Sequence, residues 1–198
     1  MLLQLQNPDS AEEVEVPEYT LIDHPSEGIP EVIETLPALD EAIEKLKAGT
    51  GPLALDAERA SGFRYSGRAY LIQIRREGSG TLLIDPTAFN NLNAVQAATD
   101  GIDWILHAAS QDLICLEMEG LSPNGQLFDT ELAGRLLGYP RVSLSSLTEA
   151  ELGITLAKEH SAADWSTRPL PTEWLNYAAL DVEFLIPLWD AMKAKLIA

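Results

Sequence analysis

The chain contains one cysteine in 198 residues, Cys115, so no disulfide bond can form within it. This scarcity favours a reducing compartment. We expect Cys115, in an apolar helical stretch, to be a small buried hydrophobic residue. No apolar run approaches the ~18 residues that a membrane helix needs, and the N-terminus lacks a basic segment followed by an apolar one. The sequence therefore predicts a cytoplasmic protein with no membrane partner.

Basic residues are also few. Lys and Arg number 13 against 31 Asp and Glu, which gives a net charge of -18. This excess of acid argues against tight, nonspecific binding to duplex nucleic acid, which needs a basic surface. The charge is uneven, because residues 1–44 hold twelve acids and no Lys or Arg, whereas residues 45–198 carry a net charge of -6. We interpret residues 1–17 as an acidic flexible leader and residues 18–198 as one folded domain.

Several motifs of well-known enzyme classes are absent. The sequence has no Walker-type phosphate loop, no G-x-G-x-x-G fingerprint, no Cys/His spacing for zinc and no G-x-S-x-G elbow. These absences exclude the nucleotide-cofactor, zinc and serine-hydrolase classes.

Hydrophobic periodicity predicts hairpin strands first, then alternating strands and helices, and finally helices alone. Glycines on both sides of Ser79 indicate a tight turn between the second and third core strands. This order is typical of an α/β fold in which a mixed β-sheet is flanked by α-helices. The expected strands are residues 19–22, 52–58, 69–75, 81–85, 104–108 and 127–128. The expected helices are residues 39–46, 92–98, 112–119, 130–137, 144–152 and, as one long final helix, 172–196.

Asp56 and Glu58 close the apolar strand PLALDAE. Residues two apart on a strand point to the same side, so both carboxylates face one direction. Side by side they repel each other unless one is protonated or a cation lies between them. Carboxylate oxygens suit Mg²⁺ or Mn²⁺. Taken alone, the D-x-E pattern fits two solvated acids at a strand end equally well.

His107 lies near the end of the predicted strand 104–108, and Asp112 follows that strand. An acid in the first turn of a helix complements the helix dipole, so Asp112 alone fits a structural role as well as a metal-binding one. His107 fits either a structural hydrogen bond or contact with a substrate.

Tyr177 and Asp181 lie four residues apart in the final helix, so they share one face beside an apolar stripe. An aspartate beside such a stripe is costly unless it is paired or binds a metal. The alternative is a boundary acid next to a core tyrosine.

The turn before the final helix has the sequence DWSTRPL, which includes Trp165 and Arg168. Arg168 fits a phosphate clamp or a structural role, and Trp165 either stacks on a base or covers the core. We interpret Asp129 as a helix cap and Asp85 as an ordinary acid.

Each motif is weak alone, but their order and spacing resemble the three exonuclease motifs of the ribonuclease D family. That family belongs to the DEDD 3′-5′ exonucleases, in the subgroup with a tyrosine in the third motif. The resemblance runs from about residue 19 to residue 196. By resemblance, Asp56 and Glu58 match motif one, Asp112 matches motif two, and Tyr177 with Asp181 match motif three. The implied fold is ribonuclease-H-like, and the implied catalytic residues are these four carboxylates and the tyrosine.

The resemblance also implies a cofactor and a substrate. Two divalent cations, Mg²⁺ or Mn²⁺, would be bound by the four carboxylates. The implied activity of residues 18–198 is removal of nucleoside 5′-monophosphates from single-stranded RNA 3′ ends, with transfer RNA precursors or other structured RNA as candidate substrates. His107, Trp165 and Arg168 are then candidate substrate-binding residues. A DNA proofreading or repair exonuclease of the same fold and a non-cleaving nucleic-acid-binding module remain alternatives.

Two features depart from the family pattern. Family members usually continue into helical HRDC domains, and this chain ends at Ala198 with no C-terminal HRDC domain. The segment after Glu58, RASGFRYSGR, is rich in arginine, and its details suit a subfamily that the resemblance does not identify. We expect the chain to be a monomer.

Overall fold

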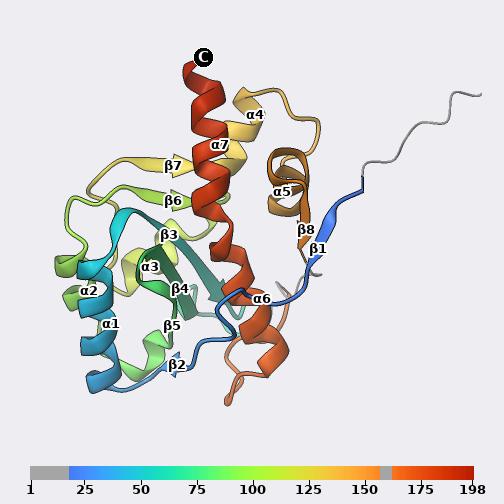
Figure 1. The fold of residues 1–198 in the computed structure, drawn as a ribbon. Coiled ribbons are helices and arrows are strands. Elements are labelled where there is room, and N and C mark those ends of the chain that lie inside the picture. The colour runs from blue at the N-terminus through green and yellow to red at the C-terminus, as the bar shows by residue number, and fades with distance from the viewer. Residues whose placement is uncertain (1–17, 157–161) are drawn as a thin grey trace, which may run out of the picture.

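The computed structural model describes residues 18–156 and 162–198. Within these residues, a six-stranded mixed sheet in the order β2-β5-β4-β3-β6-β7 forms the centre, and β1 pairs with β8 separately (Figure 1). The strands are β1 (Thr20–Ile22), β2 (Val32–Ile33), β3 (Thr50–Arg59), β4 (Ala69–Glu77), β5 (Gly80–Ile84), β6 (Trp104–Leu106), β7 (Leu127–Asp129) and β8 (Ile154–Leu156). The helices are α1 (Leu36–Ala48), α2 (Asn93–Ala98), α3 (Leu113–Met118), α4 (Thr130–Leu136), α5 (Leu144–Leu152), α6 (Thr172–Glu183) and α7 (Leu185–Ile197), with short 3₁₀ helices η1 (Pro86–Ala88) and η2 (Ala109–Gln111). The predicted α/β fold with a mixed sheet is confirmed.

The sheet is built around two consecutive hairpins. Strand β4 pairs antiparallel with both β3 and β5, and the other neighbours in the sheet are parallel. The turn between β4 and β5 requires a left-handed backbone at Gly78 (φ 84°) and Gly80 (φ 69°). Glycine adopts this conformation without a Cβ clash, which explains why this turn has two of them. Both predicted hairpins are therefore confirmed.

Residue alternation along β3 decides which side chains face the final helices. Leu55 belongs to the core cluster that lies under α1, α2 and α3. Ala54 packs on the opposite face of the sheet, against Val182 of α6. Because side chains repeat every second residue, Asp56 and Glu58 lie on the same face as Ala54. The strand therefore presents both acids towards α6.

The final helix is not continuous, so the prediction of one helix over residues 172–196 is wrong. The chain ends α6 at Glu183, turns at Phe184 and begins α7 at Leu185. Pro187 provides the physical reason. It has no N–H to donate to the carbonyl of Glu183, and in a continuous helix its ring would clash with that carbonyl. As a result, α6 contacts β3, β4 and β5, whereas α7 contacts β3 and β6.

The N-terminal strap, which we define as residues 20–28, crosses the face that carries α6. Its strand β1 runs parallel to β8, a strand that the sequence pattern did not predict. Beyond β1, His24 Nδ1 lies 2.9 Å from Asn176 Oδ1, and the backbone N–H of Ser26 donates to the Glu183 carboxylate at 3.1 Å. The strap therefore ties the start of the domain to α6. The predicted leader, residues 1–17, lies outside the described residues.

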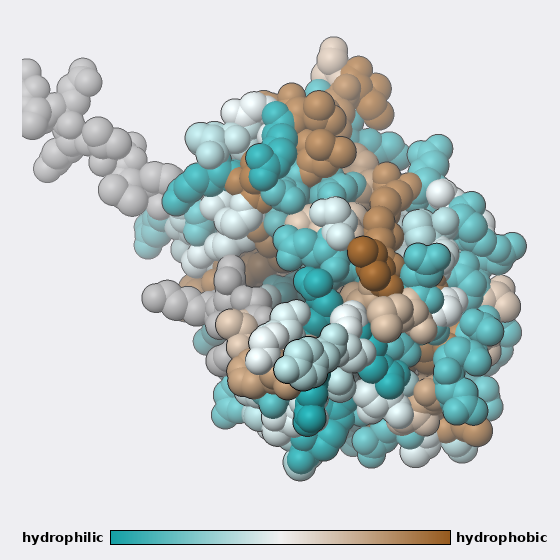
Figure 2. Space-filling view, turned by 180° about the vertical axis from the view of Figure 1, so that it is seen from behind, coloured by the Kyte–Doolittle hydropathy of each residue, from teal (hydrophilic) through white to brown (hydrophobic). Residues whose placement is uncertain are grey.

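The face seen in Figure 2 is mostly hydrophilic, and apolar side chains gather on it towards the end that carries the C-terminus of α7. Exposed apolar residues on α4 and α7 include Leu132, Leu136 and Ile197. Cys115 is buried, as predicted. Within the described ranges, no helix combines the length and the apolar character that crossing a membrane would require.

Candidate active site

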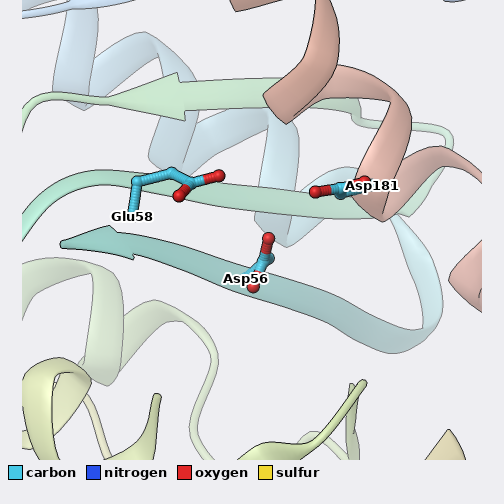
Figure 3. Close-up of side chains that lie close together, drawn as sticks. All are labelled: Asp56, Glu58 and Asp181. Carbon is cyan, nitrogen blue, oxygen red and sulfur yellow. The ribbon is translucent and has the colours of Figure 1, made fainter. Parts of the chain in front are cut away.

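Three carboxylates from two distant parts of the chain meet on the α6 side of the sheet. Asp56 and Glu58 come from β3, and Asp181 comes from α6 (Figure 3). One carboxylate oxygen from each of them lies within 4.8 Å of the others. Glu58 is buried, and its Oε1 is 3.5 Å from the amide nitrogen of Gln73 on β4. The convergence of motifs one and three that the resemblance implied is therefore present.

Asp112 joins the cluster from the turn between η2 and α3. It is buried, and its carboxyl group hydrogen-bonds with that of Asp56. It lies outside the group of three whose oxygens are mutually within 4.8 Å, but it lines the same cavity. Its nearest basic group is Arg59, whose Nη2 is 3.9 Å from Asp112 Oδ1. All four predicted carboxylates thus line one cavity of about 400 Å³.

Crowding of acids in a buried place changes their protonation. Burial raises the pKa of Glu58 well above its usual value, and the neighbouring charges of Asp56 and Asp181 raise it further. Burial also raises the pKa of Asp56, and burial together with the charge of Asp56 raises the pKa of Asp112 to about 8. The protein alone therefore disfavours the ionised state of the cluster. Hard divalent cations prefer oxygen ligands of this kind, so the residues present fit Mg²⁺ or Mn²⁺.

Tyr177 lies one helical turn before Asp181 and lines the same cavity. Its hydroxyl hydrogen-bonds with the Asp181 side chain, and its ring lies 6.5 Å from that of Trp165. Burial raises the pKa of Tyr177, and the charges of Asp181 and Glu58 raise it further. The phenol therefore keeps its proton at neutral pH and is a hydrogen-bond donor rather than a base.

His107 also lines the cavity, on the loop between β6 and η2. Its Nδ1 is 2.9 Å from Thr130 Oγ1, and burial lowers its pKa. The imidazole is therefore held in place by α4 and is neutral at physiological pH.

Asp129 has a wider structural role than the predicted helix cap. It caps α4 by accepting from Glu131 N at 2.9 Å. It also accepts the backbone N–H groups of Ala108 and Ala109, at 3.1 and 2.9 Å. Ala108 has a left-handed backbone (φ 54°), which is unusual for a residue with a Cβ. Asp129 thus holds the loop that positions His107, and sequence periodicity gives no signal for such a tertiary contact.

The predicted substrate-binding roles of Trp165 and Arg168 are not supported by their positions. Trp165 has no exposed surface and belongs to a core cluster under α6. Arg168 donates to Asp85 at 2.6 Å and to the backbone carbonyl of Tyr70 at 2.8 Å. Neither residue lines the cavity. Asp85, interpreted as ordinary from the sequence, is the buried partner of this arginine, so the DWSTRPL turn is a structural clamp.

Other residues that line the cavity were not singled out from the sequence. Arg59 directly follows the D-x-E pattern, and the start of α5 contributes the cap Ser143 and the helix residue Ser145. Ser143 caps α5 by accepting the N–H of Ser146, but its place in the cavity depends on how α5 packs. Gln111 completes the polar lining. Only the adjacency of Arg59 to Glu58 offered a signal in the sequence.

Comparisons with known proteins agree with this geometry. Residues 30–197 match the 3′-5′ exonuclease family. Ribonuclease D of Psychromonas ingrahamii is 33% identical over 172 residues, which cover 84% of this chain and 44% of that protein. Exosome complex exonuclease RRP6 of Saccharomyces cerevisiae is 32% identical over 174 residues, covering 86% of this chain and 24% of the relative.

Solved structures give the same result. A protein from Bifidobacterium adolescentis is 50% identical with a TM-score of 0.88, covering 91% of this chain and 44% of that one. Escherichia coli RNase D, described as an exoribonuclease involved in structured RNA processing, is 32% identical with a TM-score of 0.70, covering 83% of this chain and 45% of that one. The chain thus spans less than half the length of these relatives. The chain belongs to the 3′-5′ exonuclease family and is similar to its ribonuclease D and RRP6 members.

Proposed function

We propose that this chain is a metal-dependent 3′-5′ exoribonuclease that removes nucleoside 5′-monophosphates from single-stranded RNA 3′ ends. The observation that carries the proposal is the meeting of four acids from motifs one, two and three in one cavity. Among the described residues that line this cavity, Arg59 is the one side chain that is always positively charged. The cluster therefore has more negative charge than the protein itself neutralises, which is typical of a site for divalent cations.

The proposed reaction is hydrolysis of the terminal phosphodiester. Water attacks the phosphorus, the bond to the 3′-oxygen of the preceding nucleotide breaks, and that oxygen takes a proton. The chemistry supplied by two Mg²⁺ or Mn²⁺ ions bound at Asp56, Glu58, Asp112 and Asp181 is activation of the water and stabilisation of the leaving oxygen.

The chain's own residues orient the reactants. Tyr177 keeps its proton and donates it in the hydrogen bond to Asp181, so its phenol oxygen is left to accept a hydrogen bond from the attacking water and thereby orient it. Arg59, at the edge of the cluster, is placed to bind a phosphate oxygen. His107 lines the same cavity, so we propose that it contacts the 3′-terminal nucleotide. A cavity of about 400 Å³ has the size of a small-molecule site, so it takes the end of a strand rather than the side of a duplex.

The relatives support RNA as the substrate. Those of known name include ribonuclease D and an exosome exonuclease, and the Escherichia coli enzyme is described as acting in structured RNA processing. We therefore propose structured RNA, such as transfer RNA precursors, as the natural substrate, and a monomer in the cytoplasm as the working form. Light scattering of the purified chain tests the oligomeric state.

The test uses end-labelled RNA and DNA strands with Mg²⁺ or Mn²⁺. Asp56→Ala and Asp181→Ala should each lower trimming at least a hundredfold, with an unchanged circular dichroism spectrum. Asp190→Ala is the matched control, because Asp190 is an exposed acid on α7 outside the cavity lining. Full activity in either site variant refutes the assignment. Preference for DNA supports the proofreading or repair alternative, and binding without cleavage supports the non-cleaving module.

A further inference from the structure

Residues 59–76 are rich in positive charge, although the chain as a whole is acidic. Residues 59–76 contain five of the 13 Lys and Arg and no Asp or Glu. Of these five arginines, Arg68 pairs with Glu119, Arg75 with Glu27, and Arg76 with backbone carbonyls. The other two, at positions 59 and 64, lie in the segment that leads from β3 out of the cavity.

The segment after β3 forms a fixed turn. Ala60 is fully buried, and its carbonyl accepts the N–H groups of Phe63 and Arg64, both at 3.0 Å. Arg64 Nε donates to Ser166 Oγ at 2.9 Å, and Ser166 is in turn bonded to Asp164. The turn is thereby tied to the DWSTRPL clamp beside α6. Its shape is set by these bonds before any ligand arrives.

Two aromatic rings project from this turn into solvent. Tyr65 is fully exposed, and Phe63 is 55% exposed. Single exposed apolar residues need no explanation. These two rings, however, flank Arg64, and the same turn places Arg59 and Ser61 in the cavity lining. Both rings therefore belong to the chain segment that continues directly from the cavity lining at Arg59 and Ser61.

We propose that Phe63, Arg64 and Tyr65 form a stacking platform for single-stranded nucleic acid upstream of its 3′ end. The two rings stack on bases, and the guanidinium of Arg64 binds the backbone phosphate between them. Every base has a π-face, so binding by stacking tolerates any sequence, as the trimming of different RNA ends requires. The inference rests on the proposed function, since it assumes that the strand's 3′ end enters the cavity.

The platform also resolves the conflict between an acidic chain and an anionic substrate. Stacking does not depend on net charge, and only one exposed arginine is needed to hold the phosphate. Affinity would then depend on strand length. A dinucleotide occupies the cavity alone, whereas a longer strand also covers the rings.

Binding is tested by fluorescence anisotropy with a labelled single-stranded RNA of twelve nucleotides, in EDTA so that no cleavage is needed. Tyr65→Leu and Phe63→Leu keep an apolar side chain but remove the ring. Each should weaken binding about five- to tenfold, and the double variant should weaken it more. Tyr65→Phe keeps the ring and should bind within twofold of the parent. Leu132→Ala, an exposed apolar residue on α4, is the control and should bind as the parent does.

Kinetics separate the platform from the catalytic assignment. With Mn²⁺, the leucine variants should raise KM for the twelve-nucleotide strand, leave kcat unchanged, and leave cleavage of a dinucleotide unchanged. Parent-like binding in both leucine variants overturns the platform, as does equal impairment on the dinucleotide. A parent that binds through Phe63 and Tyr65 but does not cleave supports the platform and refutes the proposed function. If the parent cleaves RNA and the variants bind normally, the proposed function is supported and the platform is refuted.

Discussion

Glu58→Gln should stabilise the cation-free protein while abolishing activity. Glu58 is buried among acids, and its carboxylate is close to those of Asp56 and Asp181. Glutamine has nearly the same shape and no charge. Its amide also lies in reach of Gln73 on β4, which already approaches Glu58 Oε1 at 3.5 Å. The substitution therefore removes repulsion without opening a cavity.

The expected gain follows from the distances. At 4.8 Å, the upper limit within the trio, two unit charges repel by about 3.5 kcal/mol at an effective dielectric constant of ~20. Protonation of one carboxyl group is another way to remove this repulsion. At pH 7.5, protonating a carboxyl group with an ordinary pKa of ~4.3 costs about 4.4 kcal/mol. Repulsion larger than this cost would be relieved by protonation, so the cost is an upper limit on the repulsion that Glu58→Gln can remove. Because the side chains also move apart, we expect a net gain of about 2 kcal/mol, or a rise in Tm of roughly 4–8 °C.

Thermal unfolding in EDTA and in Mn²⁺ measures both effects. Mn²⁺ at a hundred times its Kd would stabilise the parent by about 2.7 kcal/mol, and Glu58→Gln should lose most of this. Glu119→Gln is the control. Glu119 is equally buried but pairs with Arg68 at 3.0 Å, so losing its charge should lower Tm. A lower Tm for Glu58→Gln than for the parent in EDTA would show that charge crowding does not govern this site.

Three further predictions concern single residues. Because the pKa of Asp112 is raised to about 8 from an unfolded value of 3.8, the native state holds the extra proton between these pH values, so stability in EDTA should fall as pH rises from about 4 to 8; melting curves of Asp112→Asn should show a shallower fall, and an equal slope contradicts the assignment. Tyr177→Phe should lower kcat about a hundredfold or more with an unchanged melting curve, and a small effect on kcat removes its orienting role. Arg168→Ala leaves Asp85 buried without its partner and should cost roughly 2–3 kcal/mol of unfolding free energy with KM unchanged; a raised KM at a temperature where the variant is folded would restore the phosphate-clamp hypothesis.

Local chemistry made most of the secondary structure predictable. The sequence places α5 at residues 144–152, as the structure does, because Ser143 caps it and Gly153 ends it with a left-handed backbone. The final helix was mispredicted because the apolar stripe continues through Pro187, and the periodicity outweighed the proline. Strand β8 was missed because three residues are too short to show alternation, and its partner β1 is distant in the sequence.

Local sequence patterns predict only part of the site. That Asp56 and Glu58 share a side follows from strand geometry alone. That Asp181 approaches them depends on α6 packing across β3, which no local pattern specifies, so the resemblance was needed to group them. Trp165 and Arg168 show the converse. Both looked suited to nucleic acid, but only the fold shows that Trp165 is buried and that Arg168 is paired with the buried Asp85.

The N-terminal strap gives this domain a beginning that the family match does not include. The family match starts at residue 30, yet residues 20–28 contribute a strand partner for β8 and an N–H donor for Glu183 on the helix that carries Asp181. A chain that began at residue 30 would lose these contacts with α6, the helix that carries Asp181. Truncated forms of this chain should therefore begin at residue 18 and not at residue 30.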